Sequence, residues 1–137
     1  MRIDIPTEIV LFQSQGSLTY EDWERELRAA FIATNGTIRH VLSDRRRLAS
    51  DYDLSLVEAA VDFFRSHTRE LGDARWAVLV TNASAAHRSA TTAQELAQST
   101  RIQIKVFTEL RPALEWLLGV VDDEEIERLE RWVELPR

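Results

Sequence analysis

The sequence predicts an α/β domain in which helices pack on a mixed, mostly parallel sheet of about five strands. Strand and helix patterns alternate after an initial hairpin, one strand is apolar throughout, and glycines stand where helices should end. The expected order is β-β-α-β-α-β-α-β-α-α, with right-handed crossovers. A length of 137 residues suits a single domain over 1–137, with a core over about 2–118 and an extra acidic helix over 122–135.

The first expected elements are a β-hairpin and a helix. The hairpin covers residues 2–18, because the run Ile9-Val10-Leu11-Phe12 is apolar and Gly16 can turn the chain after it. Thr19 can cap the free N–H groups of the following helix, and Gly36 can end that helix in the left-handed conformation. The inward stripe of the helix has helical spacing: Trp23, Leu27, Phe31 and Thr34.

The middle of the chain predicts a short strand over 38–44, a loop over 45–53 and a helix over about 54–71, which Gly72 stops. This helix carries side chains spaced three and four residues apart: Leu54, Val57, Val61, Phe64, Thr68 and Leu71. The run Trp76-Ala77-Val78-Leu79-Val80 is apolar without interruption, which is typical of a parallel strand buried on both faces.

The last third predicts three helices and one strand. A helix over about 85–99 buries mainly small side chains: Ala86, Ala90, Ala93, Leu96 and Ala97. Residues 102–107 alternate between apolar and polar, which indicates a strand nearer the sheet edge. Thr108 is expected to cap the helix that Gly119 ends, and an acidic amphipathic helix follows from Asp122 to about Val133.

Composition and charge narrow the possible functions. The net charge is −6, and the basic cluster is Arg45-Arg46-Arg47. Nucleic-acid binders usually show a basic surplus, so we expect no binding to nucleic acid or to an anionic membrane. The sequence contains no cysteine, no signal peptide pattern and no apolar run of the roughly 18 residues that a membrane helix needs. We therefore expect a cytoplasmic protein without stable membrane insertion.

The glycines and histidines argue against bound cofactors. Each glycine is assigned to a turn or a helix end: Gly16, Gly36, Gly72 and Gly119. None is left for a G-x-G-x-x-G loop, a Walker loop or a G-x-S-x-G elbow. The histidines are spread over three expected elements without metal-ligand spacing: His40, His67 and His87. We expect no cofactor and no metal.

Candidate ligand-binding residues follow from the expected topology, because open α/β sheets bind ligands beyond the carboxyl ends of their strands. That rim should include Asp44, Arg45, Thr81, Asn82, Ser84 and Arg88. An anion could bind the free N–H groups at the start of the third helix, near Ser84 and Arg88. The alternative is that Ser84 is a cap, Asn82 a turn residue and Arg88 a solvated charge. We favour this structural interpretation because caps and turns are common.

Two further motifs have a similar ambiguity. Arg45-Arg46-Arg47 could clamp a phosphate or an acidic partner, or it could be a solvated charged loop. Ser55 and Glu58 have capping-box spacing, and Ser55 would also suit a regulatory phosphoserine, because negative charge is favourable at a helix N-terminus. The capping role is the simpler interpretation of Ser55.

Three stretches together carry a family resemblance. They are Gly16-Ser17-Leu18-Thr19-Tyr20-Glu21-Asp22-Trp23, Val41-Leu42-Ser43-Asp44, and Ile104-Lys105-Val106-Phe107-Thr108-Glu109-Leu110 continuing to Ala113-Leu114-Glu115-Trp116-Leu117. In this order and spacing they resemble the SpoIIAA-like, STAS-type family over roughly residues 2–118.

This resemblance implies a mixed sheet flanked by helices, and no known catalytic residues. STAS domains of anti-sigma-factor antagonists bind a partner kinase and carry a phosphorylatable serine at the start of the second helix. Asp53 and Ser55 match that context loosely, but the paired serine and the glycine are absent. Other SpoIIAA-like proteins resemble lipid-carrying Sec14-type domains.

Three functional hypotheses follow. The first is a non-enzymatic regulatory module that binds a protein partner or a small apolar or anionic ligand. The second is a carrier of a small apolar, lipid-like molecule, suggested by the small side chains of the third helix and by Trp23, Phe31, Phe63 and Phe64. The third is an enzyme using Asp44 or His87 as acid or base, although no spacing supports a named reaction. A homodimer is expected if Trp132 and Leu135 share an exposed face.

Overall fold

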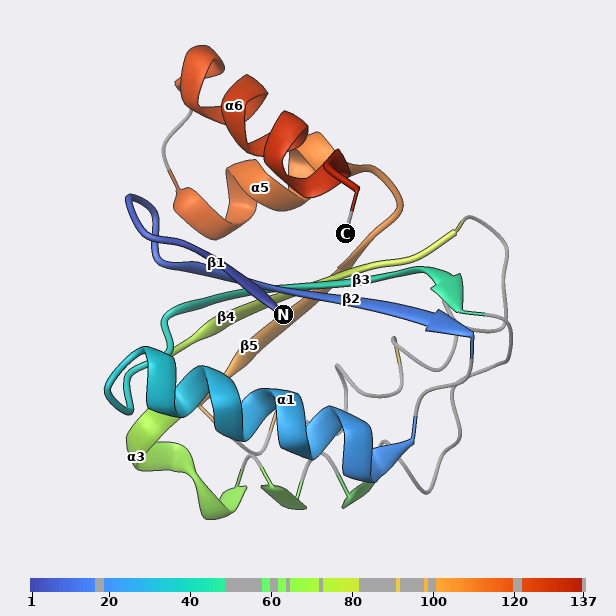
Figure 1. Ribbon diagram of the computed structural model, residues 1–137. Coiled ribbons are helices and arrows are strands. Elements are labelled where there is room, and N and C mark those ends of the chain that lie inside the picture. Colours follow the sequence, from blue (N-terminus) through green and yellow to red (C-terminus); the bar gives the residue numbers. More distant parts are fainter. Residues whose placement is uncertain are drawn as a thin grey trace.

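Helices cover both faces of a central sheet in the computed structural model of the protein (Figure 1). The structure describes residues 1–16, 19–48, 58–59, 62–63, 65–71, 73–81, 91, 98, 101–119 and 122–136. The strands are β1 (Arg2–Asp4), β2 (Ile9–Gly16), β3 (His40–Leu48), β4 (Arg75–Leu79) and β5 (Gln103–Phe107). The helices are α1 (Tyr20–Ala33), α3 (Thr68–Leu71), α5 (Leu110–Leu118) and α6 (Asp123–Glu134). α1 and α3 lie on one face of the sheet, and α5 and α6 on the other (Figure 1).

The five strands lie in the order β1-β2-β3-β4-β5. β1 pairs antiparallel with β2, and the remaining neighbours pair in parallel. The prediction of a mixed, mostly parallel five-stranded sheet is therefore confirmed. β5 stands at one end of the order, as its alternating pattern indicates.

Each face of the sheet has its own apolar core, because successive side chains of a strand point to opposite faces. The core beneath α1 includes Val10, Phe12, Trp23, Leu27, Val41, Trp76 and Val78. The core beneath α5 and α6 includes Ile9, Leu11, Leu42, Leu79, Leu114, Ile126 and Leu129. β4 contributes to both cores, as its uninterrupted apolar run predicts.

Among the described residues, the helix ends predicted at Thr19, Gly36 and Gly119 are confirmed and the one at Thr108 is wrong, while Gly72 lies outside these residues. Thr19 accepts a hydrogen bond from the backbone N–H of Asp22 at 3.2 Å, and Gly36 has a φ of +82° after the end of α1. Thr108 does not cap α5, because the N-cap residue is Glu109, whose side chain makes no capping hydrogen bond. Thr108 lies one residue outside the position from which a side chain reaches the first free amides.

The predicted loop over 45–53 is wrong in its first part, because β3 continues to Leu48. The end of β3 pairs with β2 through Gln15↔Arg47 and Gly16↔Leu48. Backbone pairing with β2 therefore continues the strand through three charged residues that show no strand pattern of their own.

Two predicted helices fall largely outside the described residues. Within 54–71, residues 58–59, 62–63 and 65–66 are helical, and α3 ends at the predicted Leu71. Within 85–99, only residues 91 and 98 are described. Across the ranges given above, no helix is long and apolar enough to cross a membrane.

Candidate functional site

Asp44 and Arg45, predicted at the end of a strand, lie inside β3, which continues to Leu48, and their side chains do not share a face. Asp44 faces α6 and Arg45 faces the core beneath α1, because neighbouring residues of a strand alternate. Thr81 follows β4 and is exposed. Asn82, Ser84 and Arg88 lie outside the described residues, as does Ser55.

Asp44 is 5% exposed and is held mainly by Arg46, two residues along the same strand. Nε and Nη2 of Arg46 donate to the two carboxylate oxygens of Asp44 at 2.9 and 2.8 Å. The backbone N–H of Arg46 donates to the same carboxylate at 3.2 Å. This two-pronged contact is the strongest form of an Arg–carboxylate pair.

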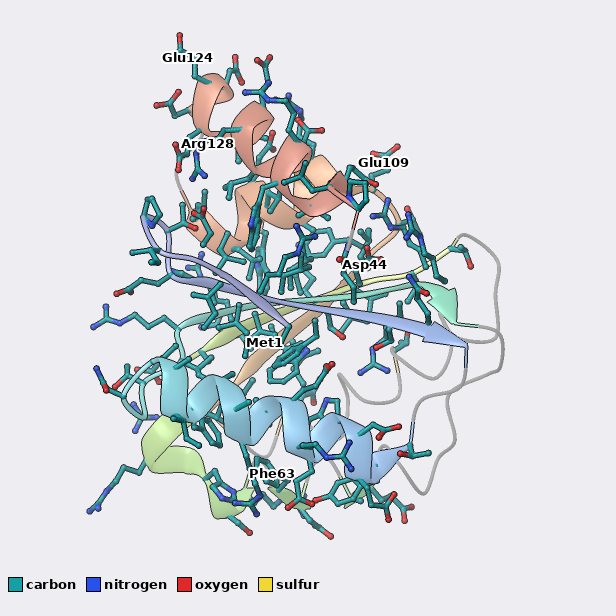
Figure 2. All side chains as sticks on the ribbon, in the orientation of Figure 1. Met1, Asp44, Phe63, Glu109, Glu124 and Arg128 are labelled. Carbon is teal, nitrogen blue, oxygen red and sulfur yellow. The ribbon has the colours of Figure 1, made fainter. Side chains whose placement is uncertain are left out.

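The contact continues to the end of α6. Arg46 donates to Glu134 at 2.9 Å, and Gln13 donates to the carbonyl oxygen of Val133 at 2.9 Å and to Asp44 at 3.5 Å. Arg2 donates to the side-chain oxygen of Gln13 at 2.9 Å. We call these five side chains the α6 latch: Arg2, Gln13, Asp44, Arg46 and Glu134. Figure 2 shows Asp44 on the side of the sheet that faces α6.

The electrostatics of Asp44 follow from this contact. Burial would raise the pKa of the Asp44 carboxyl, but the hydrogen bonds from Arg46 outweigh burial and hold that pKa below its ordinary value. Asp44 in turn raises the pKa of Arg46. Both groups are therefore charged at neutral pH, and Asp44 is a poor proton donor and a weak base.

The arginine run is divided among three surroundings. Arg45 is 4% exposed, and its Nε donates to the hydroxyl oxygen of Ser43 at 3.0 Å. Arg46 belongs to the α6 latch, and Arg47 is exposed beside Gln15. The side chains of Arg45 and Arg46 therefore do not converge, and binding of a phosphate or an acidic partner by this run stays a prediction.

A second ion cluster ties α6 to β1. Arg128 donates to both oxygens of the buried Asp4 at 2.8 and 2.9 Å, and to Glu125 at 2.6 Å. The hydrogen bond from Arg128 holds the pKa of Asp4 below its ordinary value, against the effect of burial. Figure 2 marks Arg128 on α6. In the part of the chain that the structure describes, no three His, Asp or Glu residues are grouped to hold a metal ion.

The aromatic residues behind the carrier hypothesis contact one another. The ring centroids of Trp23 and Phe63 are 5.4 Å apart, and those of Phe31 and Phe63 are 6.1 Å apart. These three rings pack as core. Phe64 and the small side chains of the third helix lie outside the described residues, so the carrier hypothesis stays a prediction.

The surface expected for a homodimer is only partly exposed. Leu135 is 55% exposed. Trp132 is half-buried, and the guanidinium of Arg2 lies 5.4 Å from its ring centre. The homodimer also stays a prediction.

Sequence patterns identified Asp44 but missed most of its partners. The period of two along a longer β3 would have placed Arg46 beside Asp44. No local pattern links either residue to Arg2 or Glu134, which lie far away in the sequence.

Comparison with known proteins gives one informative similarity. No family model matches the chain. No curated protein matches it. The crystal structure of an uncharacterised protein of the DUF3478 family from Shewanella loihica PV-4, described as having a SpoIIAA-like fold, superposes with a TM-score of 0.54. The two sequences are 24% identical, and the match covers 78% of this chain and 82% of the other. This chain therefore has a SpoIIAA-like fold, as the resemblance of its sequence implies.

Proposed function

We propose that this chain is a non-catalytic, STAS-like module that acts by binding a protein partner or a small ligand. The SpoIIAA-like fold supports the STAS-like part of the proposal. The observation that carries the non-catalytic part is the state of Asp44. This residue is level with Leu79, the last residue of β4, yet Arg46 and Gln13 bind its carboxylate internally.

A catalytic carboxyl would need a different environment. General acids and bases work best when their pKa lies near the operating pH, which for a carboxyl requires a raised pKa. The pKa of Asp44 is lowered instead. In a binding module the same residue has a structural role, because it positions Arg46, and Arg46 in turn holds the end of α6.

Turnover and stability measurements on Asp44→Asn test this proposal. Wild type and variant are incubated with a panel of phosphate esters, carboxylic esters and peptides, and products are followed by NMR. We expect no turnover by either protein, and a lower unfolding midpoint for Asp44→Asn. Asp22→Asn, which changes an exposed aspartate on α1, is the matched control. Turnover by wild type that Asp44→Asn abolishes would contradict the proposal.

The binding part is tested by thermal shift with a library of small molecules and with candidate partner proteins. A ligand present at 100 times its dissociation constant should add about 2.7 kcal/mol to the free energy of unfolding. A binding module predicts at least one such stabiliser that is recovered chemically unchanged. If nothing stabilises the protein, the binding function is wrong.

A further inference from the structure

An open hollow of about 550 Å³ lies at the end of the sheet opposite to Asp44. Its walls are the amino ends of β3 and β4 with the residues before them, together with residues of α3 and the end of α5. The volume is in the range of sites that bind small molecules. This cationic hollow, as we call it, involves none of the residues of the α6 latch.

The charge of the cationic hollow is opposite to that of the whole chain. Arg39, Arg69 and Arg75 line it, although the chain has a net charge of −6. The single acid among the lining residues is Asp73, and its carboxylate lies 2.9 Å from the guanidinium of Arg101. The lining residues therefore present a local surplus of positive charge.

These three arginines are available to a ligand. Arg69 is exposed and has no ion-pair partner among the residues that the structure describes. The pair between Arg39 and Glu8 is exposed and long, at 3.8 Å, so it is worth little. Arg75 donates to the carbonyl oxygen of Trp116 at 2.7 Å, and this neutral acceptor does not cancel its charge.

We propose that the cationic hollow binds a small, multiply charged anion through Arg39, Arg69 and Arg75. Guanidinium groups match the geometry of phosphate and carboxylate oxygens, and three of them suit a ligand with more than one negative charge. Phosphate groups fit best, because each carries up to two charges in a compact shape. This site is distinct from the Asp44 region, so it does not depend on whether the chain is catalytic.

His40 provides an internal reporter for this proposal. It lines the cationic hollow, and its buried Nδ1 has no hydrogen-bond partner among the described residues. Burial and the nearby charges of Arg75 and Arg39 lower the pKa of His40, while Glu8 acts in the opposite direction. An anion that offsets the two arginine charges should raise that pKa.

The test is a titration of the full chain with pyrophosphate and, separately, with citrate at constant ionic strength. Calorimetry gives the affinity, and NMR follows the His40 ring, assigned with His40→Gln. We expect pyrophosphate to bind and to raise the pKa of His40. Arg69→Gln should weaken pyrophosphate binding about tenfold or more, because at least one charge-assisted hydrogen bond is lost. Arg25→Gln, which removes another exposed helix arginine that does not line the cationic hollow, should bind like wild type.

The remaining comparisons identify the ligand chemistry. Pyrophosphate binding that exceeds citrate binding supports phosphate groups, and the reverse result overturns that choice. Co-sedimentation with vesicles that contain phosphatidic acid would indicate a lipid headgroup as the ligand. Pyrophosphate binding without co-sedimentation would indicate a free phosphate compound. Absence of pyrophosphate binding, or equal affinities of Arg69→Gln and Arg25→Gln, would overturn the proposal. Arg39→Gln is a second variant that leaves α3 intact.

Discussion

The replacement Leu129→Ala tests whether α6 belongs to the same cooperative unit as the sheet. Leu129 is fully buried, and it packs with Ile126 and Val133 of α6 in the core beneath α5 and α6. Removing a buried leucine side chain costs about 2–5 kcal/mol, because apolar contacts are lost and a cavity is left. Since α6 is also tied to the sheet by two ion clusters, the cavity should not close, so we expect about 3 kcal/mol or more.

Urea unfolding followed by tryptophan fluorescence measures this change in the free energy of unfolding. We expect the slope of that free energy against urea concentration to be the same in wild type and variant. Leu135→Ala is the matched control, because it makes the same change on a side chain that is 55% exposed. That control should alter stability by less than about 0.5 kcal/mol. If the two variants are equally stable, or if α6 unfolds in a separate transition, the reasoning is wrong.

Three other predictions concern a backbone position and two titrating groups. Gly36→Ala should lower the free energy of unfolding, measured with urea, by about 1–2 kcal/mol, because φ at this position is +82°. Gly36→Asn should lower it by less. The folded pKa of Asp4 is below its ordinary value of 3.8, so its stabilisation is present above about pH 4 and is lost as the pH falls through the folded pKa. Asp4→Asn should therefore flatten the acid end of the stability curve, and an unchanged curve would refute this. The folded pKa of His40 is below 6.5, so the unfolded chain takes up the proton first and stability falls as the pH drops below about 6.5. His40→Gln should abolish that loss of stability, which is measured as the free energy of urea unfolding at a series of pH values.

The fold could be predicted wherever one local pattern decided the outcome. The unbroken apolar run of β4 marks a strand buried on both faces, and Thr19 and Gly36 mark the ends of α1. The end of β3 could not be placed in this way, because the strand reaches Leu48 through the pairing of Arg47 and Leu48 with β2. Pairing between strands is a long-range interaction that local propensity does not report.

The candidate site was less predictable than the fold. The carboxyl-end rule placed Asp44 near the end of a strand but could not tell a ligand contact from a structural one. That difference depends on Arg46 and Glu134, and Glu134 lies 88 residues from Arg46 in the sequence. The cationic hollow was missed for the same reason, since Arg39, Arg69 and Arg75 stand on three separate segments and form no sequence motif.

The pKa of the Asp44 carboxyl, measured by carbon NMR in the folded protein, is the most direct test of the claim that this residue is structural. We predict a value below 3.8, because the guanidinium of Arg46 binds both carboxylate oxygens. The pKa should rise in Arg46→Gln. A value above 3.8 in the wild-type protein would mean that burial dominates at Asp44, and it would contradict the account.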